Sequence, residues 1–281
     1  METFINNKTG KLKSVIAFYY PNASDSTIRR LIKERQIKVN NEKVRENIDL
    51  LGSEKIEIFH DFKQNVSFET VYCDNNILVV NKPKGIESVN YEDNKLSMAK
   101  IVSNEYKDAM IVHRLDTNTD GLLVFALNQK AYDELINAFQ NDEINKFYLA
   151  KVYANQNLKY STLENYLVKG ENSKVEVSKT KIKNSEYAKM EYWVEKKYEE
   201  NVYLLRIKLW TGKTHQIRAQ LGYNRIYILG DGKYGDGEIN NLFKAKKMFL
   251  TAYKIEFNFN TKSFLYYLNN KLIEIEPKAY N

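Results

Sequence analysis

The chain has 281 residues, 43% of them hydrophobic, which is enough for one large domain or for a large domain with a small companion. Its apolar runs are far shorter than the roughly 20 residues that a membrane-spanning helix needs, and no signal segment opens it, so a soluble cytoplasmic protein with no membrane partner is expected. Lys and Arg exceed Asp and Glu by 43 to 36, and the net charge of +7 suits a polyanionic partner without requiring one.

The first part of the chain carries a pattern of two short helices. Apolar residues recur at helical spacing over residues 12–19, which predicts the first helix. Polar residues 24–26 are N-cap candidates for a second helix, which carries Ile28, Leu31 and Ile32 on one face. The other face of this helix is basic, and its cations are Arg29, Arg30, Lys33 and Arg35.

Strand-like alternation follows these helices, at residues 37–41 and again at residues 55–59. Two helices, a small hairpin and a basic helix face resemble the S-four-type RNA-binding domain, also called the alpha-L motif. The resemblance covers roughly residues 10–60 and implies phosphate contacts that dock structured RNA without reading its bases. The alternative is a solvated helix face, because charge runs usually are just that.

A polar stretch at residues 61–67 predicts a linker. We therefore place a small RNA-binding domain at residues 1–62 and a larger catalytic domain at residues 63–281. A Lys-, Asn- and Glu-rich segment at residues 158–185 predicts a hairpin or an insertion in the larger part.

Strands outnumber helices in this larger part. Helices are expected near residues 96–106 and 131–139. The expected strands are residues 77–81, 122–127, 146–152, 188–192, 202–209, 226–229 and 250–257. The fold class predicted is therefore α+β, with a mostly antiparallel mixed sheet.

A polar turn at residues 113–121 lies between two apolar runs and is the most informative segment of the chain. It sets the Asp116 carboxylate beside Arg114 and the imidazole of His113. Functional side chains tend to lie on such loops, because the flanking scaffold fixes their direction. Asp116 is therefore a candidate for chemistry.

Four further segments accompany this turn, at residues 81–85, 146–150, 211–218 and 229–235. Read in order, all five resemble the pseudouridine synthases of the RluA type. The central motif of that family is His-Arg-Leu-Asp, two variable residues, then Thr-Ser-Gly-Leu. The residues of the motif that this chain keeps are His113, Arg114, Leu115, Asp116, Thr119, Gly121 and Leu122. Together with the first domain, the resemblance extends from about residue 10 to the C-terminus, and five ordered motifs are a strong signal.

The resemblance implies that uridine in RNA is converted to pseudouridine without a cofactor. The bond from N1 to C1′ breaks, the uracil turns, and C5 bonds to C1′. Asp116 would attack the sugar as a nucleophile or remove a sugar proton to give a glycal, and the sequence leaves both routes open. In either route Asp116 must be ionised.

Roles for other residues follow from the same resemblance. Arg218 would pair with Asp116, since an opposite charge favours the ionised carboxylate, although an ordinary surface cation is the alternative. Tyr148 would stack on the flipped uracil and relay a proton from C5, unless it is simply a core aromatic residue. Arg114 would enter the space that the flipped base leaves. The expected RNA-binding residues are Arg114, His113, Lys82, Lys213, His215, Arg29, Arg30 and Lys33.

No metal site is expected. The single cysteine, Cys73, excludes a cysteine-based zinc site and is most simply a core residue. His113 and His215 lack further ligands at a zinc spacing, and the family uses no metal. His113 would instead orient its loop through hydrogen bonds.

Some residues depart from the family pattern. Asp120 replaces the usual Ser and adds a negative charge near Asp116, which would raise the pKa of Asp116 and lower activity if the two approach closely. Turn and cap duties explain Asp120 and Asp231 most simply. Lys213 stands where an Arg is usual, so charge is kept but bidentate geometry is lost.

The function predicted is that of a monomeric RNA pseudouridine synthase acting on structured RNA. Large-subunit ribosomal RNA is the favoured target, and transfer RNA stays open. The alternative is a non-catalytic RNA-binding or ribosome-assembly protein that retains the fold. A glycosidase needs two spaced carboxylates and a zinc deaminase needs cysteine ligands, so both are disfavoured.

Overall fold

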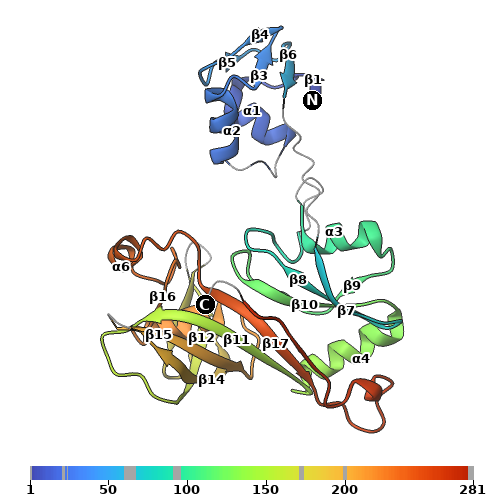
Figure 1. Ribbon diagram of the computed structural model, residues 1–281, viewed down its shortest axis with the longest axis vertical. Coiled ribbons are helices and arrows are strands. Elements are labelled where there is room, and N and C mark those ends of the chain that lie inside the picture. The colour runs from blue at the N-terminus through green and yellow to red at the C-terminus, as the bar shows by residue number, and fades with distance from the viewer. Residues whose placement is uncertain are drawn as a thin grey trace. The chain divides into compact units, whose positions relative to one another are not determined.

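Figure 1 shows the computed structural model, which describes residues 2–20, 23, 25–59, 68–90, 96–170, 174–198 and 201–277. The chain divides into two compact units. Unit 1 comprises residues 1–67 and 90–96, and unit 2 comprises residues 68–89 and 97–281. The linker predicted at residues 61–67 lies outside the described residues. No helix among the described residues is long and apolar enough to cross a membrane.

Unit 1 folds around its own core. Its elements are β1 (Glu2–Ile5), β2 (Gly10–Lys11), α1 (Leu12–Tyr19), α2 (Asp25–Lys33), β3 (Ile37–Val39), β4 (Glu42–Lys43), β5 (Asp49–Leu50) and β6 (Lys55–Ile58). The strands form a four-stranded sheet in the order β1-β6-β3-β4 and a separate β2–β5 pair. Both predicted helices and the hairpin are present, and Ile28, Leu31 and Ile32 are buried as their spacing predicts. Asn40 and Asn41 adopt positive φ angles of 50° and 70°, which Asn tolerates better than most residues, and so close the β3–β4 turn.

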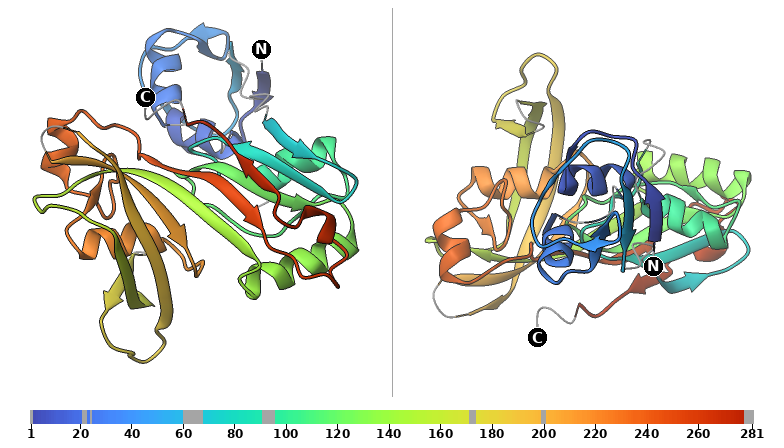
Figure 2. Two further views of the ribbon diagram at one scale, coloured as in Figure 1. Left: turned by 60° about the horizontal axis from the view of Figure 1, so that its bottom comes forward. Right: turned by 90° about the horizontal axis from the view of Figure 1, so that it is seen from above.

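Unit 2 is built on one long sheet. Its strands are β7 (Glu69–Cys73), β8 (Ile77–Lys82), β9 (Met110–Ile111), β10 (Asp120–Ala126), β11 (Ile144–Tyr153), β12 (Ser161–Lys169), β13 (Val175–Ser178), β14 (Glu186–Lys197), β15 (Val202–Leu209), β16 (Tyr227–Ile228), β17 (Leu250–Phe257) and β18 (Leu272–Glu274). The main path runs β13-β12-β14-β15-β11-β17-β10-β8-β7, while β9, β16 and β18 pair with β10, β11 and β17. The hairpin predicted at residues 158–185 is formed by β12 and β13, which project from one end of the sheet in Figure 2.

Helices cover this sheet at both ends. They are α3 (Met98–Glu105), α4 (Gln129–Gln140), α5 (Gln216–Tyr223) and α6 (Gly237–Leu242), and a 3-10 helix spans Tyr266–Leu268. Residues of α4 and of β8, β10 and β17 share one apolar core, which includes Leu135, Val79, Val124 and Phe257. The fold is α+β with a mostly antiparallel mixed sheet. Cys73 is exposed, so the prediction that it is a core residue is wrong.

One pair of neighbouring strands is parallel. β10 and β17 pair in parallel through Asp120 opposite Thr251 and Gly121 opposite Ala252. Gly121 has a φ of +113°, and a Cβ atom there would lie 2.1 Å from the carbonyl oxygen of Ala252. Only glycine fits this approach, which brings the turn before β10 close to β17.

Candidate active site

A cleft of about 570 Å³ in unit 2 brings three of the sequence motifs together. The turn between β9 and β10 supplies Asp116 and Arg114, and β11 supplies Tyr148. The segment that leads into α5 supplies His215, and α5 itself supplies Arg218. The cleft therefore collects residues from distant parts of the sequence around one carboxylate.

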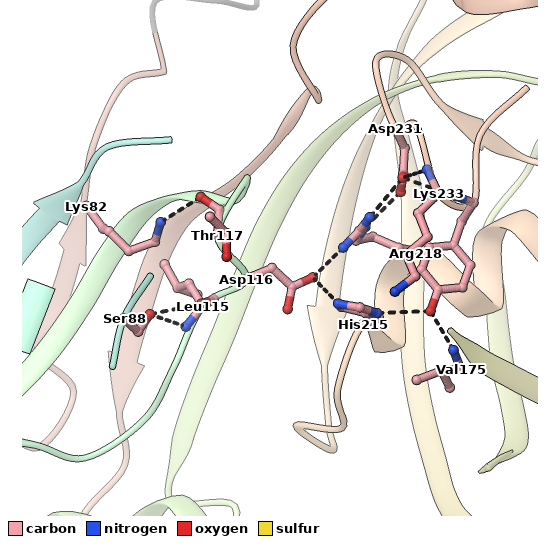
Figure 3. A network of polar contacts seen from close by, with 11 residues as sticks. Lys82, Ser88, Leu115, Asp116, Thr117, Val175, His215, Arg218, Asp231 and Lys233 are labelled. Carbon is pink, nitrogen blue, oxygen red and sulfur yellow. Dashed lines mark hydrogen bonds and ion pairs between the residues drawn. The ribbon is translucent and has the colours of Figure 1, made fainter. Parts of the chain in front are cut away.

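Arg218 holds two carboxylates at once (Figure 3). Its Nη1 donates to Asp116 Oδ2 at 3.0 Å, while Nε and Nη2 donate to the two oxygens of Asp231 at 2.8 and 2.9 Å. The side chain of Arg218 is 8% exposed and that of Asp231 is 1% exposed. Burial opposes both charges, yet the mutual ion pair raises the pKa of Arg218 and lowers the pKa of Asp231. The guanidinium is thus a fixed, permanently charged partner for Asp116.

The partner role of Asp231 was not predicted from the sequence. Its role in a turn was predicted and is observed: Oδ1 accepts hydrogen bonds from the backbone N–H groups of Lys233 (2.8 Å) and Tyr234 (3.1 Å). The same carboxylate also faces Arg218, 13 positions earlier in the chain. A short Gly-Asp-Gly segment signals a turn, but nothing in its sequence identifies the side chain that the turn faces.

Helix α5 begins abruptly and is buried. His215 precedes it with a φ of 53°, and Gln216 Oε1 accepts from Thr211 Oγ1 (2.8 Å) and from the N–H of Lys213 (3.0 Å). Residues 216–221 are all buried, so no amphipathic pattern marks this helix and the sequence did not predict it. The buried helix fixes the backbone from which Arg218 reaches Asp116.

His215 lies between Asp116 and Tyr234. Its Nε2 is 4.0 Å from Asp116 Oδ2, and its Nδ1 is 2.9 Å from the hydroxyl of Tyr234. That hydroxyl already accepts from the N–H of Val175 at 2.7 Å. A neutral imidazole with its proton on Nε2, facing Asp116, satisfies all of these groups. Burial lowers the pKa of His215 although Asp116 opposes this, which agrees with the neutral form.

Tyr148 lies on β11 with its side chain in the cleft. The residue is 7% exposed, and burial, with the nearby Asp116 charge, raises the pKa of its phenol. The phenol is therefore neutral across the physiological range. Neighbouring strands β15 and β17 pair with β11 at this residue and hold it in place.

Lys82 is fully buried, with 0% exposure. Its Nζ donates to the carbonyl oxygens of Pro83 (2.9 Å), Ile86 (2.7 Å) and Thr117 (3.2 Å). Burial lowers its pKa to about 8, although Asp120 and Asp116 oppose the shift. The expectation that Lys82 contacts RNA is wrong, because its buried ammonium donates to two carbonyl oxygens of the turn after β8 and to one, Thr117, of the turn that carries Asp116.

Two further side chains fix this turn. Ser88 Oγ accepts from the N–H of Leu115 and donates to its carbonyl oxygen, both at 2.9 Å. His113 Nε2 accepts from the N–H of Val124 at 3.0 Å, and the ring lies 4.7 Å from that of Phe139. Burial, with the nearby Lys146 charge, lowers the pKa of His113 to about 3. His113 orients its loop as a neutral acceptor, and Ser88 was missed because a lone serine gives no sequence signal.

The predicted RNA contacts differ in how accessible they are. Arg114 is exposed at the cleft and forms no ion pair with another described residue. Lys213 also lines the cleft and pairs with Glu186 at 2.8 Å. In unit 1, Arg29 pairs with Asp25 (2.6 Å), Arg30 pairs with Glu34 (3.1 Å), and all three predicted cations of α2, including Lys33, are exposed. In the described part of the chain, no group of three or more His, Cys, Asp or Glu residues could hold a metal ion.

Known proteins resemble this chain in sequence and fold. Residues 76–223 match the family model described as RNA pseudouridylate synthase. An uncharacterized RNA pseudouridine synthase of Mycoplasma capricolum is 32% identical, over 99% of this chain and 98% of its own length. Ribosomal large subunit pseudouridine synthase C of Rickettsia conorii is 27% identical over 88% of each chain. Ribosomal large subunit pseudouridine synthase D of Borreliella burgdorferi is 32% identical over 77% of this chain and 67% of its own.

A solved structure has the same fold. Human RNA pseudouridylate synthase domain containing 1 aligns with a TM-score of 0.60 at 20% identity. The alignment covers 77% of this chain and 93% of the human chain.

Proposed function

Because the chain belongs to the RNA pseudouridylate synthase family, we propose that it isomerises uridine to pseudouridine at Asp116, in large-subunit ribosomal RNA. The reaction of the family exchanges a bond from N1 to C1′ for a bond from C5 to C1′. No electrons are gained or lost, and the proton that leaves C5 balances the one that N1 gains. The chemistry therefore needs one ionised carboxylate at the sugar and a place for the uracil to turn.

The observation that carries this proposal is the ion pair of Asp116 with Arg218. The guanidinium donates to Asp116 Oδ2 at 3.0 Å, and Asp231 fixes its orientation through two further hydrogen bonds. A fixed opposite charge favours the ionised carboxylate, which both the nucleophilic and the glycal route require. Pre-organised charge of this kind costs no reorganisation at the moment of reaction.

The cleft also holds the groups that a flipped uridine needs. Tyr148 presents a neutral phenol on which the uracil would stack, and stacking on an aromatic ring contributes about 1–3 kcal/mol. Its hydroxyl would pass on the proton that leaves C5. Arg114 is exposed and unpaired among the described side chains, so its planar guanidinium would fill the space that the base leaves.

Two features support ribosomal RNA as the target. Relatives from Rickettsia conorii and Borreliella burgdorferi are named as synthases of the large ribosomal subunit. Unit 1 would be an S-four-type RNA-binding module, and the exposed cations of α2 would contact phosphates. We further propose a monomer that acts in the cytoplasm, which gel filtration and cell fractionation test.

Substitution Asp116→Asn tests the chemistry. We expect it to abolish pseudouridine formation while folding and RNA affinity stay unchanged, because the amide keeps the shape and loses the charge. Asp133→Asn is the matched control, since Asp133 is exposed on α4, outside the cleft. Pseudouridine is measured by mass spectrometry of chemically labelled RNA. Undiminished product from the Asp116 variant would remove that residue from the mechanism.

The same assay separates the enzyme from a non-catalytic RNA-binding protein. Such a protein would bind RNA with an affinity that falls as salt rises, and would form no pseudouridine. Mapping pseudouridines in the RNA of a deletion strain identifies the target. If the deletion strain lacks a pseudouridine in transfer RNA alone, transfer RNA and not ribosomal RNA is the substrate.

A further inference from the structure

A second carboxylate, Asp120, begins strand β10 beside the Asp116 turn. Thr251 lies opposite it on β17, and its Oγ1 donates a hydrogen bond of 2.6 Å to Asp120 Oδ1. The same oxygen is 3.3 Å from Lys84 Nζ, on the turn after β8. Lys84 Nζ also donates to the carbonyl oxygen of Met248, just before β17, at 2.5 Å. One ammonium thus links a carboxylate of β10 to the backbone that enters β17.

These contacts cross the narrowest joint along the main path of the sheet, among the described strands. One part of the sheet, β7 to β10, carries the Asp116 turn, and the other part, β11 to β17, carries Tyr148 and supports α5. The two parts meet where β10 pairs with β17, over two residue pairs. By contrast, β10 and β8 pair over six, and β11 and β17 over seven. Few backbone hydrogen bonds therefore fix Asp116 relative to the rest of the cleft.

We propose that Lys84, Asp120 and Thr251 form a clamp across this joint, and that Lys84 and Asp120 are positioning residues for Asp116. The inference rests on the proposed catalytic role of Asp116. Asp120 was expected to weaken the site as a second negative charge, but Lys84 compensates that charge. The clamp would hold the Asp116 turn at the distance from which Arg218 reaches its carboxylate.

The charge on Lys84 matters more than either hydrogen bond. With Asn at position 120, the Thr251 hydroxyl keeps an acceptor, and Lys84 keeps the carbonyl of Met248. With Met at position 84, the half-buried Asp120 carboxylate stays charged and loses its ion-pair partner. An uncompensated charge in such a place is costly, and the turn would move to expose it to water. Removing both charges should therefore harm the enzyme less than removing the ammonium alone.

Steady-state kinetics of Lys84→Met, Asp120→Asn and the double variant test the clamp. We expect Lys84→Met to lower kcat by about 10- to 100-fold, because a displacement near 1 Å has that effect, with KM for RNA unchanged. Asp120→Asn should lower kcat less, and the double variant should return to the Asp120→Asn level. Lys254→Met is the matched control, because Lys254 pairs with Glu256 at 2.8 Å on β17. The side chains of this pair are 21% and 29% exposed, close to the 20% and 29% of Lys84 and Asp120.

Two results would overturn the clamp. Additive losses in the double variant would show that the two residues act independently. A rise in KM with kcat unchanged would make Lys84 an RNA contact. If the wild-type protein forms no pseudouridine, the proposed function fails, and hydrogen exchange of residues 115–119 decides the clamp instead. The amides of Leu115 and Thr119, which donate to Ser88 Oγ and to the Asp116 carbonyl oxygen, should lose protection in Lys84→Met and regain it in the double variant. Equal protection in all variants would exclude the clamp.

Discussion

Replacing Asp231 by Asn removes the charge that fixes Arg218. The carboxylate is 1% exposed and accepts two hydrogen bonds from the guanidinium, at 2.8 and 2.9 Å. An asparagine keeps the oxygen that accepts from the backbone N–H groups of Lys233 and Tyr234 and from Arg218 Nη2, but it turns an NH₂ group toward the Nε–H donor of Arg218. Asp116 remains as a partner, at the opposite end of the guanidinium.

Removing one partner of a buried ion pair costs about 3–5 kcal/mol of folding free energy. For a domain of this size, 1 kcal/mol lowers the melting temperature by about 2–4 °C, so a fall of roughly 6–20 °C is expected. The pKa of Asp231 is lowered in the folded state, so the ionised carboxylate contributes fully to the free energy of unfolding above about pH 4, and this contribution is lost as the pH falls further. The difference between the wild type and the variant should therefore shrink in acid.

Thermal unfolding at pH 7 and at pH 3 measures both effects. Glu195→Gln is the control, because Glu195 forms an exposed pair with Arg206 at 2.6 Å, and such pairs contribute about 0–1 kcal/mol. Pseudouridine formation should fall with Asp231→Asn, since Arg218 is then no longer held in a fixed orientation at Asp116. A melting temperature no lower than that of the control would refute the reasoning that Asp231 fixes the guanidinium.

Three further outcomes follow from the cleft. Lys82→Met should lower stability and kcat but leave RNA affinity unchanged, because the ammonium is buried; weaker RNA binding in a filter assay would contradict this. In the wild type, a His113 with a folded pKa of about 3 is protonated first in the unfolded chain, so the free energy of unfolding falls between pH 6.5 and pH 4. His113→Gln should remove this fall. Urea titrations at several pH values should then show a dependence of the free energy of unfolding on pH that is smaller by about 1.4 kcal/mol per pH unit. Arg114→Ala should slow the reaction on a structured RNA more than on an unpaired oligonucleotide, because base flipping costs a few kcal/mol only in the former; equal losses would argue against a wedge.

The sequence allowed the sheet and the turn that carries Asp116 to be predicted because their patterns are local. Strands β15 and β17 occupy the predicted residues, since apolar and polar residues alternate in each over an ordinary strand length. Helix α5 could not be found in this way, because residues 216–221 are all buried, the polar ones included, and so no exposed polar face alternates with an apolar one. Its Arg218 was placed by resemblance, and the structure puts it on Asp116 as expected.

The errors concern side chains whose partners are distant in the sequence. Lys82 is buried because three carbonyl oxygens converge on it, one of them from Thr117, 35 residues away. Asp231 faces an arginine on another element, and Asp120 faces Lys84 and Thr251. Whether a charged residue faces solvent or a partner depends on which turns the fold brings together, and composition and spacing do not contain that information.

The separate core of unit 1 bears on how the enzyme finds its substrate. Eleven buried apolar residues, from Leu12 to Ile58, pack within this unit alone. If unit 1 holds RNA, its contacts raise the effective concentration of the target uridine at the cleft without touching the reacting atoms. Substitutions on α2 would then change the KM for RNA and leave kcat unchanged. Affinity and chemistry could thus vary independently in this chain, because each belongs to a part with its own core.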